Sequence, residues 1–163
     1  MNFMQENKLL KIGSILFIVG GLLGGLVPII NSLSTMGTAS QITSAYGSEE
    51  AFDQMILAQS GGTIGGDAVL SIFFGTIIVI AVLYAIMMII HVLVGVLGLS
   101  RAKNPQRSRF FTVWGIILLI FGVLNVLLSG VFSLSAILGM ISGIAAPILF
   151  LVGASQMKKA QQA

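Results

Sequence analysis

A single histidine interrupts a long apolar run and is the first residue to consider for chemistry. His91 lies within AIMMIIHVLVG (residues 85–95), and no other acidic or basic side chain occurs between Asp67 and Arg101. An imidazole in a membrane can relay a proton, contact a ligand or form a neutral hydrogen bond between helices. We favour the neutral hydrogen bond, with an expected acceptor near Pro147, which cannot donate to the carbonyl of Gly143.

Two further polar residues lie in apolar runs and join His91 as a candidate polar membrane site. Asn125 is expected to hydrogen-bond between helices, with substrate contact as the alternative. Tyr84 lies on the same helical face as His91, and this face is expected to point into protein because it carries polar and small residues. The face of His91 comprises Tyr84, Met87, Met88, Gly95 and Gly98.

Other chemistries lack the residues that they need. The chain has no cysteine and one histidine, and no carboxylate lies near His91 in sequence, so no metal, cofactor or catalytic set is predicted. The acids Glu49, Glu50, Asp53 and Asp67 do not have the spacing of a calcium loop and are expected on a solvated loop face. No basic stripe alternates with aromatic residues, which argues against nucleic acid as a partner. The chain is therefore predicted not to be an enzyme.

The elements that position these residues are long apolar segments. Of the 163 residues, 56% are hydrophobic and 8% are charged, which predicts a surface that faces lipid. The expected fold is an all-α membrane protein, a single integral membrane domain (1–163) with a four-transmembrane-helix bundle. Its predicted segments are a first span at about 10–31, an outer loop at 32–67, a second span with an outer extension at 68–100, a basic loop at 101–109, a third span at 110–128 and a fourth span at 135–156.

The distribution of charge predicts the orientation. Lysines and arginines occur before the first span, in the loop 101–109 and after the fourth span, which are on one side when there are four spans. Short basic segments are typical of the cytoplasmic side, so both termini are predicted to be cytoplasmic and the loop 32–67 extracellular. A cleaved secretory signal ending near residue 39 is the alternative.

The second span is longer than a bilayer requires. The apolar side chains of its outer extension are therefore expected to pack against another segment. The segment SEEAFDQMILAQ (48–59) predicts a short amphipathic helix with Ser48 as its N-cap and Phe52, Met55 and Ile56 on one face. This helix is expected to pack on the extension or to lie in the lipid interface, and these three residues are candidate partner-binding residues. The polar segment 34–47 is expected to be a loop.

Small residues at helical spacing predict close helix packing. Packing within one bundle is favoured, and an interface between copies is the alternative. A weak internal repeat also aligns Gly13 with Gly115 and Gly20 with Gly122. The candidate packing residues are Gly20, Gly21, Gly24 and Gly25 in the first span and Ser135, Gly139 and Gly143 in the fourth.

The chain has a glycine-rich first span that follows a lysine, a hairpin that ends at GLSRAKN (98–104) and a second glycine-rich hairpin. In these three features it resembles small bacterial four-span membrane proteins of unknown function. The resemblance implies a bacterial cell membrane and no particular activity. Claudins and tetraspanins share the four-span layout, but their cysteine motifs are absent. The chain is expected to be a non-enzymatic accessory, scaffold or interaction subunit that contacts membrane lipids and a protein partner or a second copy. The alternative is an oligomeric channel or proton-linked transporter that uses His91.

Overall fold

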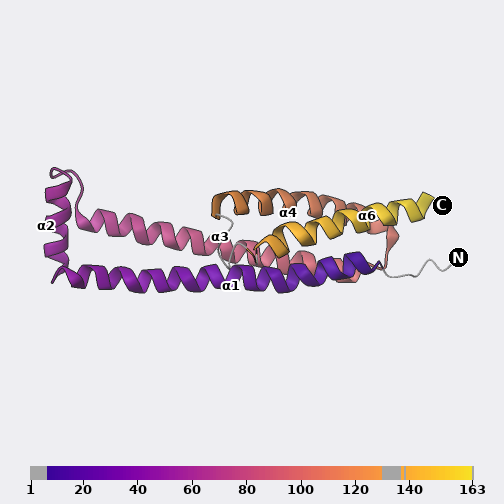
Figure 1. Ribbon diagram of the computed structural model, residues 1–163, viewed down its shortest axis with the longest axis horizontal. Helices are drawn as coiled ribbons and strands as arrows, with labels where there is room; N and C mark the ends of the chain where they lie inside the picture. The colour runs from indigo at the N-terminus through magenta and orange to yellow at the C-terminus, as the bar shows by residue number, and fades with distance from the viewer. Residues whose placement is uncertain (1–6, 130–136, 138, 163) are drawn as a thin grey trace. The chain divides into compact units, whose positions relative to one another are not determined.

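The computed structural model describes residues 7–129, 137 and 139–162, except for the side chains of 39, 40, 42 and 43. The described residues are helical apart from residue 7 and the connections 46–48, 60–65 and 102–104. These residues contain no strand, as predicted. Figure 1 shows the helices in chain order. They are α1 (Lys8–Ala45), α2 (Glu49–Gln59), α3 (Gly66–Arg101), the 3-10 turn η1 (Pro105–Arg107), α4 (Ser108–Ser129), the π-helical turn η2 (Ile141–Ala145) and α6 (Ala146–Gln162).

Four segments are long and apolar enough to cross a membrane, which confirms this part of the prediction. They are Lys8–Thr38, Gly66–Arg101, Pro105–Leu127 and Ile141–Gln162. A crossing needs about 20 apolar residues. The chain therefore has the helices of a multi-pass membrane protein.

The chain divides into two compact units, each built from segments that are distant in sequence. Residues 1–27 and 86–163 form one unit, here called the four-helix unit, and residues 28–85 form the other, here called the hairpin unit. The first contains the start of α1, the end of α3, α4 and α6 with η2. The second contains the end of α1, α2 and the start of α3.

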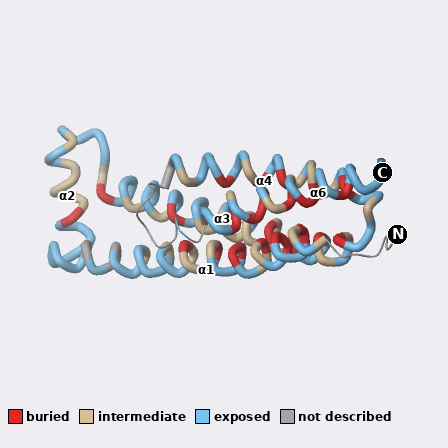
Figure 2. Tube along the Cα trace, turned by 45° about the vertical axis from the view of Figure 1, so that its right-hand side comes forward, coloured by how far each residue is buried: buried red, intermediate tan, exposed pale blue. Residues whose placement is uncertain are grey.

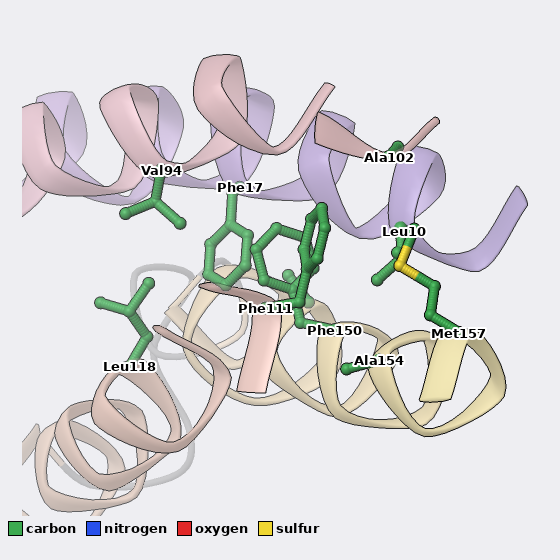
Figure 3. Packing of buried hydrophobic residues seen from close by; sticks show 10 residues of the cluster. Leu10, Phe17, Val94, Ala102, Phe111, Leu118, Phe150, Ala154 and Met157 are labelled. Atoms are coloured by element: carbon green, nitrogen blue, oxygen red, sulfur yellow. The ribbon is translucent and has the colours of Figure 1, made fainter. Parts of the chain in front are cut away.

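Aromatic rings form the centre of the four-helix unit. The ring of Phe150 packs edge-on against Phe17 at 4.7 Å and against Phe111 at 5.0 Å, between ring centroids. Figure 3 shows these rings meeting from α1, α4 and α6. Edge-to-face pairs are favourable beyond the area that they bury. Apolar side chains gain little free energy by leaving lipid for protein. Specific contacts such as these ring pairs therefore determine how the helices pack.

The fourth span is a composite helix that ends later than predicted. The predicted range was 135–156, whereas α6 continues to Gln162 because Gln, Met, Lys and Ala are good helix formers. The predicted start, including Ser135, lies outside the described residues. The turn η2 places the N–H of Ala146 on the carbonyl of Ile141, directly before Pro147. A wider turn is one way for a helix to accommodate a proline, which lacks a backbone donor.

The prediction of a loop over 34–47 is wrong, because α1 continues to Ala45. Its hydroxyl groups hydrogen-bond to carbonyls one turn back: Thr35 Oγ1 donates to Asn31 O at 2.8 Å and Thr38 Oγ1 to Ser34 O at 3.1 Å. Such bonds satisfy polar side chains on the helix itself, so a polar composition does not end it. The helix ends before Gly47, whose φ of +89° favours glycine.

The short helix predicted over 48–59 is present as α2. Ser48 is its N-cap, and its side chain accepts a hydrogen bond from the N–H of Ala51 at 3.1 Å. Within the hairpin unit, α2 links the end of α1 to the start of α3 (Figure 1). Gly61 and Gly62, with φ of +66° and +80°, form the turn that follows.

Candidate functional site

His91 is buried in the four-helix unit, with 8% of its surface exposed. Its Nδ1 atom lies 2.7 Å from the carbonyl oxygen of Met87, one turn back on α3. A carbonyl oxygen only accepts hydrogen bonds, so Nδ1 must carry the hydrogen and donate it. In a neutral imidazole with this tautomer, Nε2 presents a lone pair.

The Nε2 atom of His91 is buried and has no hydrogen-bond partner among the described residues. Its surroundings are apolar: the ring of Phe17 lies 5.6 Å away between centroids, and the backbone of Gly21 lies against the histidine Cβ. The predicted acceptor, the carbonyl of Gly143, is not the partner that the structure shows, because the histidine reaches its own helix instead. The carbonyl of Gly143 lies against Gly122 of α4.

The glycines of α1 allow two neighbouring elements to approach its backbone. A Cβ atom on Gly21 would lie 2.5 Å from the Cβ of His91, and one on Gly25 would lie 2.5 Å from the Cβ of Met88. A Cβ on Gly20 would lie 2.9 Å from the Cβ of Ser142 in η2. Gly24 is half-buried. The position of His91 therefore depends on the absence of a side chain at residue 21.

Two glycines of α3 make the reciprocal approach to α1. A Cβ on Gly95 would lie 2.7 Å from the carbonyl oxygen of Ser14, and one on Gly98 would overlap the hydroxyl of Ser14. Ser14 is fully buried and donates to Leu10 O at 2.7 Å. Ser14 was not among the predicted packing residues. Its spacing from Gly21, seven residues or about two turns, is the signal that places it on the same face.

The small residues of the fourth span contact α4. A Cβ on Gly143 would lie 2.8 Å from the Cα of Gly122, and one on Gly139 would lie 3.6 Å from Asn125 Nδ2. Asn125 is exposed, whereas His91 is buried, so the two side chains do not share one enclosed environment. Tyr84 is half-buried and belongs to the hairpin unit. The three candidate polar residues thus occupy three different environments.

The glycines that align in the proposed repeat contact the same composite helix from two sides. A Cβ on Gly13 of α1 would lie 3.0 Å from Phe150, and one on Gly115 of α4 would lie 3.0 Å from Leu151. Further along, Gly20 faces Ser142, and Gly122 faces Gly143. Equivalent glycines of α1 and α4 therefore meet neighbouring residues of η2 and α6.

The apolar face of α2 packs within the hairpin unit. Phe52 is buried, with its ring 5.5 Å from that of Tyr46 between centroids, and a Cβ on Gly66 would lie 2.8 Å from it. Met55 and Ile56 are half-buried. Phe52 thus contacts the start of α3, as expected for a helix that packs on the extension of the second span. The partner-binding role of these residues stays a prediction.

Asp53 is not simply part of a solvated loop face, as predicted, but caps α3. Its Oδ1 accepts a hydrogen bond from the N–H of Gly66 at 2.6 Å. A carboxylate at this place satisfies an otherwise unpaired backbone donor and complements the positive end of the helix dipole. A Cβ on Gly65 would lie 2.7 Å from the same oxygen, which explains two glycines in succession.

Apolar side chains cover the exposed surface of the first half of α3. Ile72 is the most exposed of them at 69%, while Ile77 on the same helix is 8% exposed. Figure 2 shows the predominance of exposed positions along this segment. The exposed large apolar residues are Val69, Ile72, Phe73, Ile78, Val79, Ile80, Val82 and Leu83.

No group of three His, Cys, Asp or Glu side chains that could hold a metal ion occurs within the described part of the chain. Comparison of the chain with protein-family models, with curated proteins and with solved structures finds no match.

Proposed function

We propose that the protein is a non-enzymatic accessory or interaction subunit of a bacterial cell membrane. Both termini are cytoplasmic in this proposal, and the hairpin unit faces the outside. Its apolar α3 surface contacts a protein partner or a second copy. The observation that carries the proposal is the row of exposed apolar side chains between Val69 and Leu83.

The length of α3 supports this assignment. The helix has 36 residues, whereas a crossing needs about 20. Counting about 20 residues back from the basic end at Arg101 reaches Val82, so residues 69–81 extend past one hydrocarbon thickness. An exposed apolar patch of this kind is typical of protein–protein or membrane contact.

The composition of the hairpin unit supports a protein contact in addition to lipid. The end of α1 in this unit is rich in Ser and Thr, whereas the start of α3 is mostly apolar, with Asp67, Ser71 and Thr76 among its few polar residues. A polar helix favours water and an apolar one favours lipid or protein. Association with another apolar surface removes the apolar side chains of α3 from water, while the polar end of α1 stays in water.

An oligomeric channel or proton-linked transporter is the second candidate, and one observation favours it. His91 Nε2 has no hydrogen-bond partner among the described residues, as expected of a group that accepts a proton or binds a ligand. The apolar neighbours Phe17 and Gly21 do not form a polar path, which weighs against this candidate. Proton flux into liposomes that depends on His91 would replace the first proposal with the second.

Polar substitution of the α3 surface tests the interaction proposal. The double variant Ile72→Ser/Val79→Ser is compared with Ile120→Ser/Leu124→Ser, which alters two apolar residues on α4 that are also exposed. After purification in a mild detergent, native mass spectrometry of the wild type is expected to show a companion chain or a second copy. The α3 variant should lose it and the α4 variant should keep it. Monomeric wild-type protein, or equal loss in both variants, contradicts the proposal.

A further inference from the structure

Basic side chains gather at one end of the four-helix unit from three segments far apart in sequence. The described part of this unit contains eight lysines and arginines and no Asp or Glu. All except Arg101, which is half-buried, are exposed. They are Lys8 and Lys11 on α1, Arg101, Lys103, Arg107 and Arg109 around η1, and Lys158 and Lys159 on α6.

Packed side chains hold the basic segments of α1 and α6 together. Leu10, Ala102 and Met157 belong to one buried cluster and are seen near one another in Figure 3. Gly153 of α6 admits the side chain of Leu10 at close range. Asn7 Nδ2 also donates to the carbonyl of Gly153 at 3.1 Å, which fixes the start of α1 on α6.

The connection between α3 and α4 is an ordered turn that packs on the same end. Asn104 is the N-cap of η1, and its Oδ1 accepts from the N–H of Gln106 at 3.1 Å. The turn contacts both α4 and α6. The guanidinium of Arg101 lies 4.2 Å from the ring centroid of Phe110. These contacts restrict the backbone that carries Arg107 and Arg109.

We propose that this basic end binds the phosphate groups of anionic phospholipids in the leaflet that it faces. These exposed cations lie on packed backbone segments at the end of helices long enough to span a membrane, where they can meet headgroup phosphates, and bases near an anionic surface are attracted to it. Arginine adds bidentate hydrogen bonds to phosphate oxygens. The proposal concerns the four-helix unit and does not depend on a partner of the hairpin unit.

Lipid selectivity measured by electron paramagnetic resonance tests the proposal. The protein is reconstituted in phosphatidylcholine bilayers with spin-labelled phosphatidylglycerol or spin-labelled phosphatidylcholine, and the protein-bound fraction of each lipid is compared. The charge-removing variant is Arg107→Gln/Arg109→Gln/Lys158→Gln/Lys159→Gln. Its matched control, Arg107→Lys/Arg109→Lys/Lys158→Arg/Lys159→Arg, keeps every charge. Glu49→Gln/Glu50→Gln changes charge in the hairpin unit.

The wild type is expected to prefer phosphatidylglycerol severalfold at low salt. The preference should weaken in 0.5 M NaCl because salt screens the charges: the Debye length falls from about 10 Å at 0.1 M to about 3 Å at 1 M. The glutamine variant should lose most of this preference, because each base near an anionic surface contributes about 1 kcal/mol. The charge-keeping control and the Glu49/Glu50 variant should retain it. Equal binding of both lipids by the wild type, full preference in the glutamine variant, or loss in the charge-keeping control overturns the proposal.

Discussion

His91 shows how far one polar residue in an apolar run can be understood from sequence. Its inward orientation could be predicted, because Gly95 and Gly98 share its face and both approach α1. Its hydrogen-bond partner could not, since an acceptor on its own helix, Met87 O, competes with any acceptor on a neighbour. Sequence spacing identifies the face of a side chain but does not choose between acceptors within its reach.

Replacing His91 distinguishes a packing residue from a working one. His91→Met removes the unpaired Nε2 at similar volume, so the free energy of unfolding is expected to change by less than about 1.5 kcal/mol, because removing an unsatisfied polar atom offsets altered packing. His91→Ala leaves a cavity and should cost about 2 kcal/mol or more. Unfolding in mixed micelles measures both. A loss for His91→Met as large as that for His91→Ala would contradict this expectation, because it would show that the imidazole makes a stabilising interaction that a methionine of similar volume cannot replace.

At the scale of the helix, the glycines of α1 decide which element can approach. Gly21→Ala is expected to destabilise the four-helix unit by at least about 1–3 kcal/mol, the usual cost of overpacking, because its methyl group would lie 2.5 Å from the Cβ of His91. Gly75→Ala on α3 is the control, because a Cβ there meets nothing within 4 Å. It should be neutral or stabilising by up to about 1 kcal/mol, the helix propensity difference. Equal destabilisation by both substitutions contradicts the observed packing.

The start of α3 depends on a residue of a different helix. Asp53→Ala is expected to destabilise this helix end by about 1 kcal/mol, because the N–H of Gly66 loses its charged acceptor. Hydrogen–deuterium exchange should accelerate in the first turn of α3. Glu50→Ala, which alters an exposed acid of α2, is the control and should leave that turn unchanged. Unchanged exchange in the Asp53 variant would contradict the cap.

The ends of a helix could be predicted where the length of an apolar run determines them. They could not be predicted where side-chain hydrogen bonds are involved. The apolar run alone predicted α3, and Ser48 with two following acids predicted α2. In the extension of α1 to Ala45, Thr35 and Thr38 bond to carbonyls of their own helix, so the polar composition of this segment did not reveal that it is helical. Asp53 as a cap was missed because its partner, Gly66, lies 13 residues away.

For the whole molecule, the opposite charges of its two units predict its orientation. The hairpin unit contains four acids and no base, while the four-helix unit carries all eight bases. The chain has no cysteine, so single cysteines are specific reporters. A membrane-impermeant maleimide should label Glu50→Cys in intact cells and should label Gln106→Cys only after lysis. Labelling of both in intact cells, or the reverse pattern, contradicts cytoplasmic termini.

Contact of the α3 surface with another protein is the central claim, and photo-crosslinking in intact cells tests it most directly. A benzophenone amino acid replaces Ile72, which is 69% exposed, or Ile77, which is 8% exposed. With the probe at residue 72, ultraviolet light is expected to produce a discrete species larger than the monomer, identified by mass spectrometry as a second copy or a specific partner. The probe at residue 77 should leave the chain monomeric. Only monomer or lipid adducts at residue 72 would contradict the claim.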